Sequence, residues 1–416
     1  MTVPSVRAHV GPSAMVTVGL AAVGAAGYVF LALSGHRLPA EDAAAVASFY
    51  LIVSIAGPGM FTGLEQQTSR SASAHGQLAV VARHAALVGG GLLAIALAVL
   101  AAVGPLIADR VLGGRWELLA AVAFAVVAAA GAYVIRGLLG GARRFATYAA
   151  TLVVEGVARI LLCTAIVLSG VPDASLYAAA FGLGTVIAVA VGLSALRDVA
   201  AAVPSVADPA HLRSMARGAV LLLACGLGFQ VVANLAPLVV AAASAIDPGT
   251  AAAFASASVL VRIPVIFFVA VQSVLLPTLT RAAADGAVAV VRATLLRFAG
   301  IVAAIGAVTV GAAITVGPDA VHLLFGGHTR LSGWLVGLLA VGTVPLLLTQ
   351  VLMPALLALG EHRAVTAAWL SGGTVLVALL AVLPTDPMTT AALAQIAGGV
   401  TVAIVMGVRL VRPRRS

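Results

Sequence analysis

Two oppositely charged residues, Glu155 and Arg159, lie in the middle of the apolar segment 147–169. Their spacing of four residues places both on one face of a helix, with the glutamate on the N-terminal side, which is the favourable order for an ion pair. A charge in so apolar a segment is costly unless it meets a partner or a water-filled cavity. Two interpretations follow. The pair neutralises itself, or Arg159 presents its charge to an anionic substrate while Glu155 holds it or exchanges a proton.

A second arginine, Arg262, lies inside the apolar segment 250–276, with no acidic residue within a helical turn. It therefore needs a partner from another helix, a cavity that holds water, or a ligand. Pro264 follows closely, and a proline inside a helix removes a backbone hydrogen bond and can kink the helix. We expect Arg262 either to face a cavity or to form a buried pair with a neighbouring helix.

Three amide side chains are further candidates for the same site. Gln230 and Asn234 are again four residues apart, in segment 215–242, and Gln272 lies in the segment that holds Arg262. Amides in apolar helices often join one helix to another, and they can also contact a polar substrate. The predicted substrate cavity therefore comprises Glu155, Arg159, Gln230, Asn234, Arg262 and Gln272.

The sequence carries no signature of an enzyme. It has no His-Glu-x-x-His, Gly-x-Ser-x-Gly or Walker A motif, and no cysteine and histidine cluster at metal-binding spacing. Cys163 and Cys225 lie in apolar segments, where we expect them to behave as small buried hydrophobic side chains. We expect no catalytic residue, no cofactor and no metal site.

The elements that position these residues are long apolar helices. Hydrophobic residues make up 62% of the 416 residues, charged residues only 9%, and the mean hydropathy is +1.15. A water-soluble protein carries about 25% charged residues, so most of this chain is expected to face lipid as membrane-spanning helices. The predicted spans cover residues 14–34, 43–63, 82–106, 117–139, 147–169, 176–195, 215–242, 250–276, 294–316, 332–356, 364–383 and 389–408.

The positions of the arginines predict how the helices cross the membrane. The chain has no lysine, and most of its 23 basic residues, Arg136 among them, lie in or beside alternate connections between the spans. Basic residues favour cytoplasmic loops, so both termini are expected in the cytoplasm. The absence of lysine and the single asparagine, Asn234, are typical of a GC-rich genome, so we expect a bacterial plasma-membrane protein.

The chain divides into two halves at its longest polar connection. We expect an N-terminal six-helix lobe at 1–196, a cytoplasmic linker at 197–214 and a C-terminal six-helix lobe at 215–416. The segments 138–150 and 356–368, which end the fourth and the tenth span, are weakly alike. Because six is even, both halves have the same orientation, as in parallel repeats about an axis normal to the membrane. The expected fold is an all-α polytopic membrane protein of 12 transmembrane helices.

Three passages resemble polysaccharide-type flippases of the multidrug/oligosaccharidyl-lipid/polysaccharide exporter superfamily. They are residues 136–148 followed by Glu155 and Arg159, residues 259–281 around Arg262, and residues 57–70. The resemblance implies two lobes around a cavity that move a lipid-diphosphate-linked oligosaccharide from the inner to the outer leaflet for cell-surface polysaccharide biosynthesis. It also implies that Arg159 and Arg262, one in each lobe, meet the anionic head group, to which guanidinium groups bind well.

The resemblance implies as partners the lipid-linked glycan, membrane lipids, and a polysaccharide polymerase or glycosyltransferases, with no nucleic acid. Two other functions stay open. One is a 12-helix secondary transporter or drug exporter for a small solute, although residues 64–79 lack the Gly-x-x-x-Asp-Arg-x-Gly-Arg-like run of major facilitators. Segment 14–34 also lacks the acidic residue typical of the drug-extruding branch. The other is a glycan ligase or polymerase, which should have a larger external loop than residues 317–331.

Overall fold

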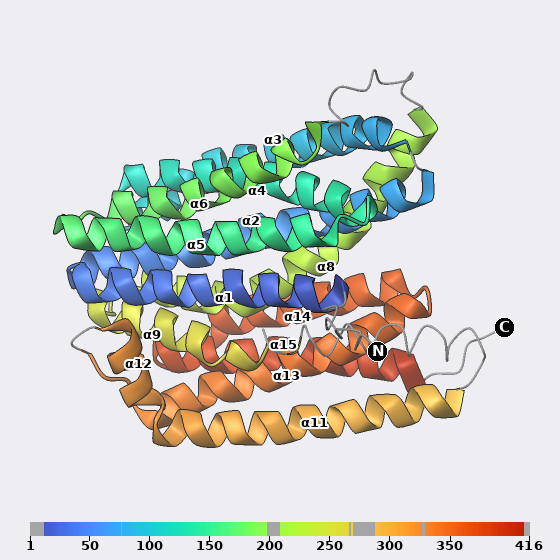
Figure 1. Ribbon diagram of the computed structural model, residues 1–416. Coiled ribbons are helices and arrows are strands. Elements are labelled where there is room, and N and C mark those ends of the chain that lie inside the picture. The colour runs from blue at the N-terminus through green and yellow to red at the C-terminus, as the bar shows by residue number, and fades with distance from the viewer. Residues whose placement is uncertain are drawn as a thin grey trace, which may run out of the picture.

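The computed structural model describes residues 12–75, 77–197, 209–265, 268, 288–326 and 329–411. Within these residues, twelve helices are long and apolar enough to cross a membrane, as the hydropathy of the sequence predicts. Figure 1 shows the helices in two groups, with the first six above, α9 and α11 to α15 below, and α8 running down from the upper right between them. The predicted all-α, 12-helix architecture of two lobes is confirmed.

The N-terminal lobe contains the first six helices. In it α1 packs on α5, α2 packs on α4, and α6 packs on both α4 and α5. The second helix is longer than the predicted span 43–63, because its polar C-terminal residues continue the helix beyond the apolar stretch. The helices are α1 (Pro12–Arg37), α2 (Ala40–His75), α3 (Leu78–Arg110), α4 (Trp116–Gly141), α5 (Phe145–Ser169) and α6 (Ala174–Ser194).

The C-terminal lobe is built around α13 and α15, which pack on each other, with α11 and α14 at their sides. Its first helix begins at Pro209, inside the predicted linker, of which residues 198–208 lie outside the described part. A short helix at 317–325 replaces part of an expected loop, with Pro318 and Asp319 in its first turn, both favourable there. The helices are α8 (Pro209–Ala242), α9 (Pro248–Leu260), α11 (Val288–Thr315), α12 (Gly317–Phe325), α13 (Gly333–Ala358), α14 (His362–Val382) and α15 (Pro387–Val411).

The helices alternate in direction, so their connections lie at two ends of the molecule (Figure 1). We call the end that holds the start of α1 and the end of α15 the terminal end, and the opposite end the far end. Short capping motifs close the helices at the far end. Gly170 ends α5 in a left-handed conformation (φ 71°), which favours glycine. The carboxylates of Asp173 and Asp247 accept backbone N–H groups at the starts of α6 and α9.

The two lobes contact each other mainly along α2 and α8 and at the far end. Gly63 of α2 lies so close to α8 that an added Cβ would be 2.8 Å from the Cβ of Leu222, and small residues permit such close packing of membrane helices. The largest apolar core is shared by both lobes and includes Phe30, Phe254 and Phe325. The smaller cores each lie within one lobe. Burial of apolar side chains therefore joins the lobes both along α2 and α8 and at the far end.

Candidate functional site

The predicted pair of Glu155 and Arg159 forms, and a second arginine joins it. The Arg159 Nη2 donates to Glu155 Oε1 at 2.7 Å, and the Thr185 hydroxyl donates to the same oxygen at 3.0 Å. Arg136 binds the other carboxylate oxygen of Glu155. Arg136 was expected at the border of a connection, but it is only 6% exposed inside the lobe. Arg136 can be buried because its acidic partner comes from α5 and not from its own helix.

This N-terminal cluster is enclosed by its own lobe. Glu155 is 7% exposed and Arg159 4% exposed. The Arg159 guanidinium carbon lies 3.5 Å from the centroid of the Phe181 ring, a cation–π contact. A further carboxyl, Glu65 of α2, accepts the Tyr148 hydroxyl at 2.5 Å. The burial favours the interpretation in which Glu155 neutralises its neighbouring arginines so that they can lie inside the helix bundle.

The predicted residues of the C-terminal lobe also come together. The Asn234 side-chain amide donates to Gln230 Oε1 at 2.8 Å, which confirms that both residues share a helix face. The Asn234 Oδ1 in turn accepts Arg262 Nη1 at 2.6 Å. The Nε and Nη2 of Arg262 are buried and have no hydrogen-bond partner within the described residues. The Arg262 guanidinium thus has a hydrogen-bond acceptor for only part of its N–H groups, and that acceptor is an uncharged amide. Gln272 lies outside the described residues.

Two tyrosines lie between the two clusters. Tyr50 of α2 lies near both Arg159 and Arg262, and Tyr28 of α1 lies near Arg262. The Tyr50 ring stands 6.0 Å from the Phe181 ring, edge to face. Tyr50 therefore lies near one arginine of each lobe and belongs to an aromatic group of the N-terminal lobe. Aromatic residues are only 5% of the chain, so their grouping in the first two spans is a signal that the sequence analysis missed.

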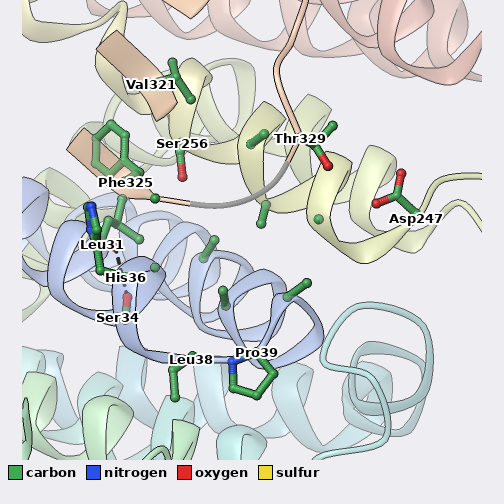
Figure 2. A pocket seen from close by; sticks show the side chains of 18 residues that line it. Leu31, Ser34, His36, Leu38, Pro39, Asp247, Ser256, Val321, Phe325 and Thr329 are labelled. Atoms are coloured by element: carbon green, nitrogen blue, oxygen red, sulfur yellow. Dashed lines mark hydrogen bonds between the residues drawn. The ribbon is translucent and has the colours of Figure 1, made fainter. Parts of the chain in front are cut away.

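A cavity of about 360 Å³ lies between the lobes at the far end, and neither Arg159 nor Arg262 lines it. Figure 2 shows His36 and Ser34 of α1 on one side, with Ser256 and Phe325 of the C-terminal lobe on the other. Beside it the backbones meet, because an added Cβ on Gly35 would overlap the carbonyl oxygen of Phe325. The cavity is therefore an unfilled part of the far-end contact and is separate from the arginine clusters.

The described residues offer no group of three or more histidine, cysteine, aspartate or glutamate side chains that could hold a metal ion. Cys163 and Cys225 are free and buried, as expected from their apolar surroundings. The polar chemistry of the described interior consists of guanidinium, carboxylate, amide and phenol groups. Such groups can bind an anion and can exchange protons.

No family model matches the chain, and no curated protein matches it. Solved structures do match over nearly its whole length. A multidrug resistance MATE family transporter of the MOP superfamily in an inward-facing conformation has a TM-score of 0.73 at 16% identity, covering 94% of each chain. An outward-facing structure of a transporter described in the same words has a TM-score of 0.63 at 17% identity, covering 96% of this chain and 94% of that chain.

The lipid II flippase MurJ in an inward closed conformation has a TM-score of 0.66 at 13% identity, covering 94% of this chain and 86% of MurJ. At these identities the likeness establishes the fold. The chain is a multi-pass membrane protein of twelve apolar helices in two lobes, and its fold is that of the MATE transporters of the MOP superfamily, with MurJ a further structural neighbour.

Proposed function

We propose that this protein is a flippase of the MOP superfamily that moves a lipid-linked diphosphate oligosaccharide from the inner to the outer leaflet by alternating access. The observation that carries the proposal is the state of Arg262. Its guanidinium lies at the lobe interface, its only described side-chain partner is the neutral Asn234, and two of its nitrogens have no acceptor among the described residues. A diphosphate offers several anionic oxygens, and guanidinium is the side chain best suited to bind them.

The proposal includes an orientation. With both termini in the cytoplasm, the far end faces outward, and the contact of Gly35 with Phe325 closes the outer side. The higher TM-score with the inward-facing MATE structure than with the outward-facing one agrees with this closure. In this state a head group would reach Arg262 from the cytoplasmic side, and separation of the far-end contact would release it outward.

A small-solute transporter is the alternative, because several structural neighbours are multidrug transporters. The positive charge at the lobe interface favours one of the two functions over the other. Arg159 and Arg262 both lie near Tyr50, so a positively charged solute beside that ring would meet two guanidiniums in a medium of low dielectric. An anionic ligand gains from the same arrangement. The proposal therefore places the protein in polysaccharide biosynthesis, in a bacterial plasma membrane and beside a polymerase or glycosyltransferases, without catalytic activity of its own.

Deletion of the gene, followed by analysis of the lipid-linked sugars in each leaflet, tests the proposal. We expect lipid-linked oligosaccharide to accumulate on the cytoplasmic face, and wild-type protein to restore export. Arg262→Ala should fail to restore it although the protein is folded and inserted. Arg330→Ala is the matched control, because Arg330 is exposed at the far end and pairs with Asp319 at 2.9 Å. Unchanged lipid-linked sugars together with altered uptake of a solute would overturn the proposal.

A further inference from the structure

A hydrogen bond from Tyr28 links the two lobes beside Arg262. The Tyr28 hydroxyl of α1 donates to the carbonyl oxygen of Val259 in α9 at 3.0 Å. Helices α1 and α9 otherwise touch only over a short stretch. Tyr28 is partly buried and lies near Arg262 and Tyr50. The bond is therefore a polar link between the lobes, and its acceptor lies three residues before Arg262, whose guanidinium is proposed to bind the anion.

The carbonyl that Tyr28 contacts belongs to a break in the helix. Because Pro264 has no N–H, the carbonyl of Leu260 loses the donor that a continuing helix would supply. The regular α-helix ends at Leu260. The backbone N–H of Arg262 donates a hydrogen bond to the Val259 carbonyl at 3.1 Å. The Val259 carbonyl thus accepts two donors, one from its own turn and one from the other lobe. This turn carries Arg262, so whatever holds the turn also directs the guanidinium.

We infer that Tyr28 is a positioning residue for anion binding, which holds the Arg262 turn only while the lobes are closed at the far end. The inference rests on the proposed function. The Asn234 amide holds the guanidinium from within the C-terminal lobe, and Tyr28 holds its backbone from the N-terminal lobe. When the lobes separate at the far end, the Tyr28 bond breaks while the Asn234 bond does not. Affinity for the anion is therefore higher in the closed state, and opening promotes release.

The test uses Tyr28→Phe, which removes one hydroxyl and keeps the ring. Tyr177→Phe is the matched control, because the Tyr177 hydroxyl is buried without a hydrogen-bond partner in the described structure. Binding of farnesyl diphosphate to the purified full chain is measured by calorimetry, with uncharged farnesol as the reference ligand. Loss of one hydrogen bond should lower affinity about fivefold in Y28F. Affinity should be unchanged in Y177F, and farnesol binding should not change in either variant.

Far-end separation is measured in parallel. Spin labels at Arg110→Cys in α3 and Leu323→Cys in α12 report the distance between the lobes, with Cys163 and Cys225 replaced by alanine. Both label sites are exposed. We expect Y28F to shift the distance distribution toward longer values and Y177F to leave it unchanged. Pro264→Ala, which returns a donor to the helix, should lower the affinity for farnesyl diphosphate by moving the turn.

The outcomes separate this inference from the proposed function. If Arg262→Ala binds farnesyl diphosphate like the wild type, the proposed function fails. If Arg262→Ala loses binding while Y28F keeps both wild-type affinity and wild-type distances, the positioning role of Tyr28 is overturned and the proposed function stands. Longer distances with unchanged affinity would also overturn it, since Tyr28 would then join the lobes without directing Arg262. In an Arg262→Ala background, residual binding should be the same with or without Y28F.

Discussion

Glu155→Gln should be among the most destabilising conservative substitutions in the N-terminal lobe. The carboxylate is 7% exposed and binds Arg136, Arg159 and Thr185. Glutamine keeps the size of the side chain and removes its charge, so two buried guanidiniums lose their compensation. Breaking a buried ion pair from one side costs about 3–5 kcal/mol, and here one substitution affects two pairs. We expect the free energy of unfolding to fall by at least about 3 kcal/mol.

Arg159→Met is the informative comparison. It removes a hydrogen bond to Glu155 and the cation–π contact with Phe181, but Glu155 keeps Arg136 and Thr185. The expected loss is smaller, about 1–3 kcal/mol, because no buried charge is left without a partner. The same burial predicts that methionine fits, since Arg159 already packs its stem among apolar neighbours in the lobe interior.

The assay is reversible unfolding of the purified protein in detergent micelles, followed by circular dichroism, with the wild type and both variants under identical conditions. Glu155→Gln should unfold at clearly lower denaturant than Arg159→Met. Equal stability of Glu155→Gln and the wild type, or a larger loss in Arg159→Met, would refute the reasoning that the carboxylate is the centre of the cluster. A normal unfolding curve combined with lost export would instead assign Glu155 to transport.

Two further predictions concern the far end. Gly35→Ala should prevent closure, because the new methyl group would overlap the Phe325 carbonyl, and the spin-label distance between the lobes should lengthen. Gly373→Ala, with nothing near its added Cβ, should change nothing. The side-chain and backbone hydrogen bonds from Thr250 hold the pKa of Asp247 below its ordinary value. This stabilisation of the α9 start is complete above the ordinary pKa and is lost as pH falls through the lowered pKa. Protection of the Thr250 amide against hydrogen exchange should therefore fall in acid relative to an Asp247→Asn variant, and an identical pH dependence in both would contradict the cap.

The number of helices and their order could be predicted because both depend on local composition. Each span must satisfy its own backbone hydrogen bonds in lipid, so an apolar stretch of sufficient length is enough to define it. The ends were harder to predict. The polar residues Glu65, Gln66 and Gln67 mark the end of the apolar stretch, but α2 continues to His75. A helix can extend past the membrane core wherever its residues keep helical propensity, and hydropathy does not report this.

The candidate site could be predicted only where its contacts lie within one helix. The pairs of Glu155 with Arg159 and of Gln230 with Asn234 follow from a spacing of four residues, and both form. The bond of Arg262 to Asn234 and that of Arg136 to Glu155 join residues of different helices. Sequence spacing says nothing about such neighbours. Tyr28 was missed for the same reason, since its partner is a backbone carbonyl in the other lobe.

The two interior arginines differ in a way that their equal depth in the sequence does not reveal. Arg159 has a carboxylate at 2.7 Å and an aromatic ring over its face, so a ligand would have to displace existing favourable contacts to reach it. Among the described residues Arg262 has one neutral side-chain partner and two nitrogens without an acceptor, so an anion would add contacts there without breaking any. Binding energy is therefore expected to come mainly from the C-terminal lobe. The N-terminal lobe supplies Tyr28 and the buried charged cluster around Glu155. Such an asymmetric site lets the ligand stay with one lobe while the other moves away, which alternating access requires.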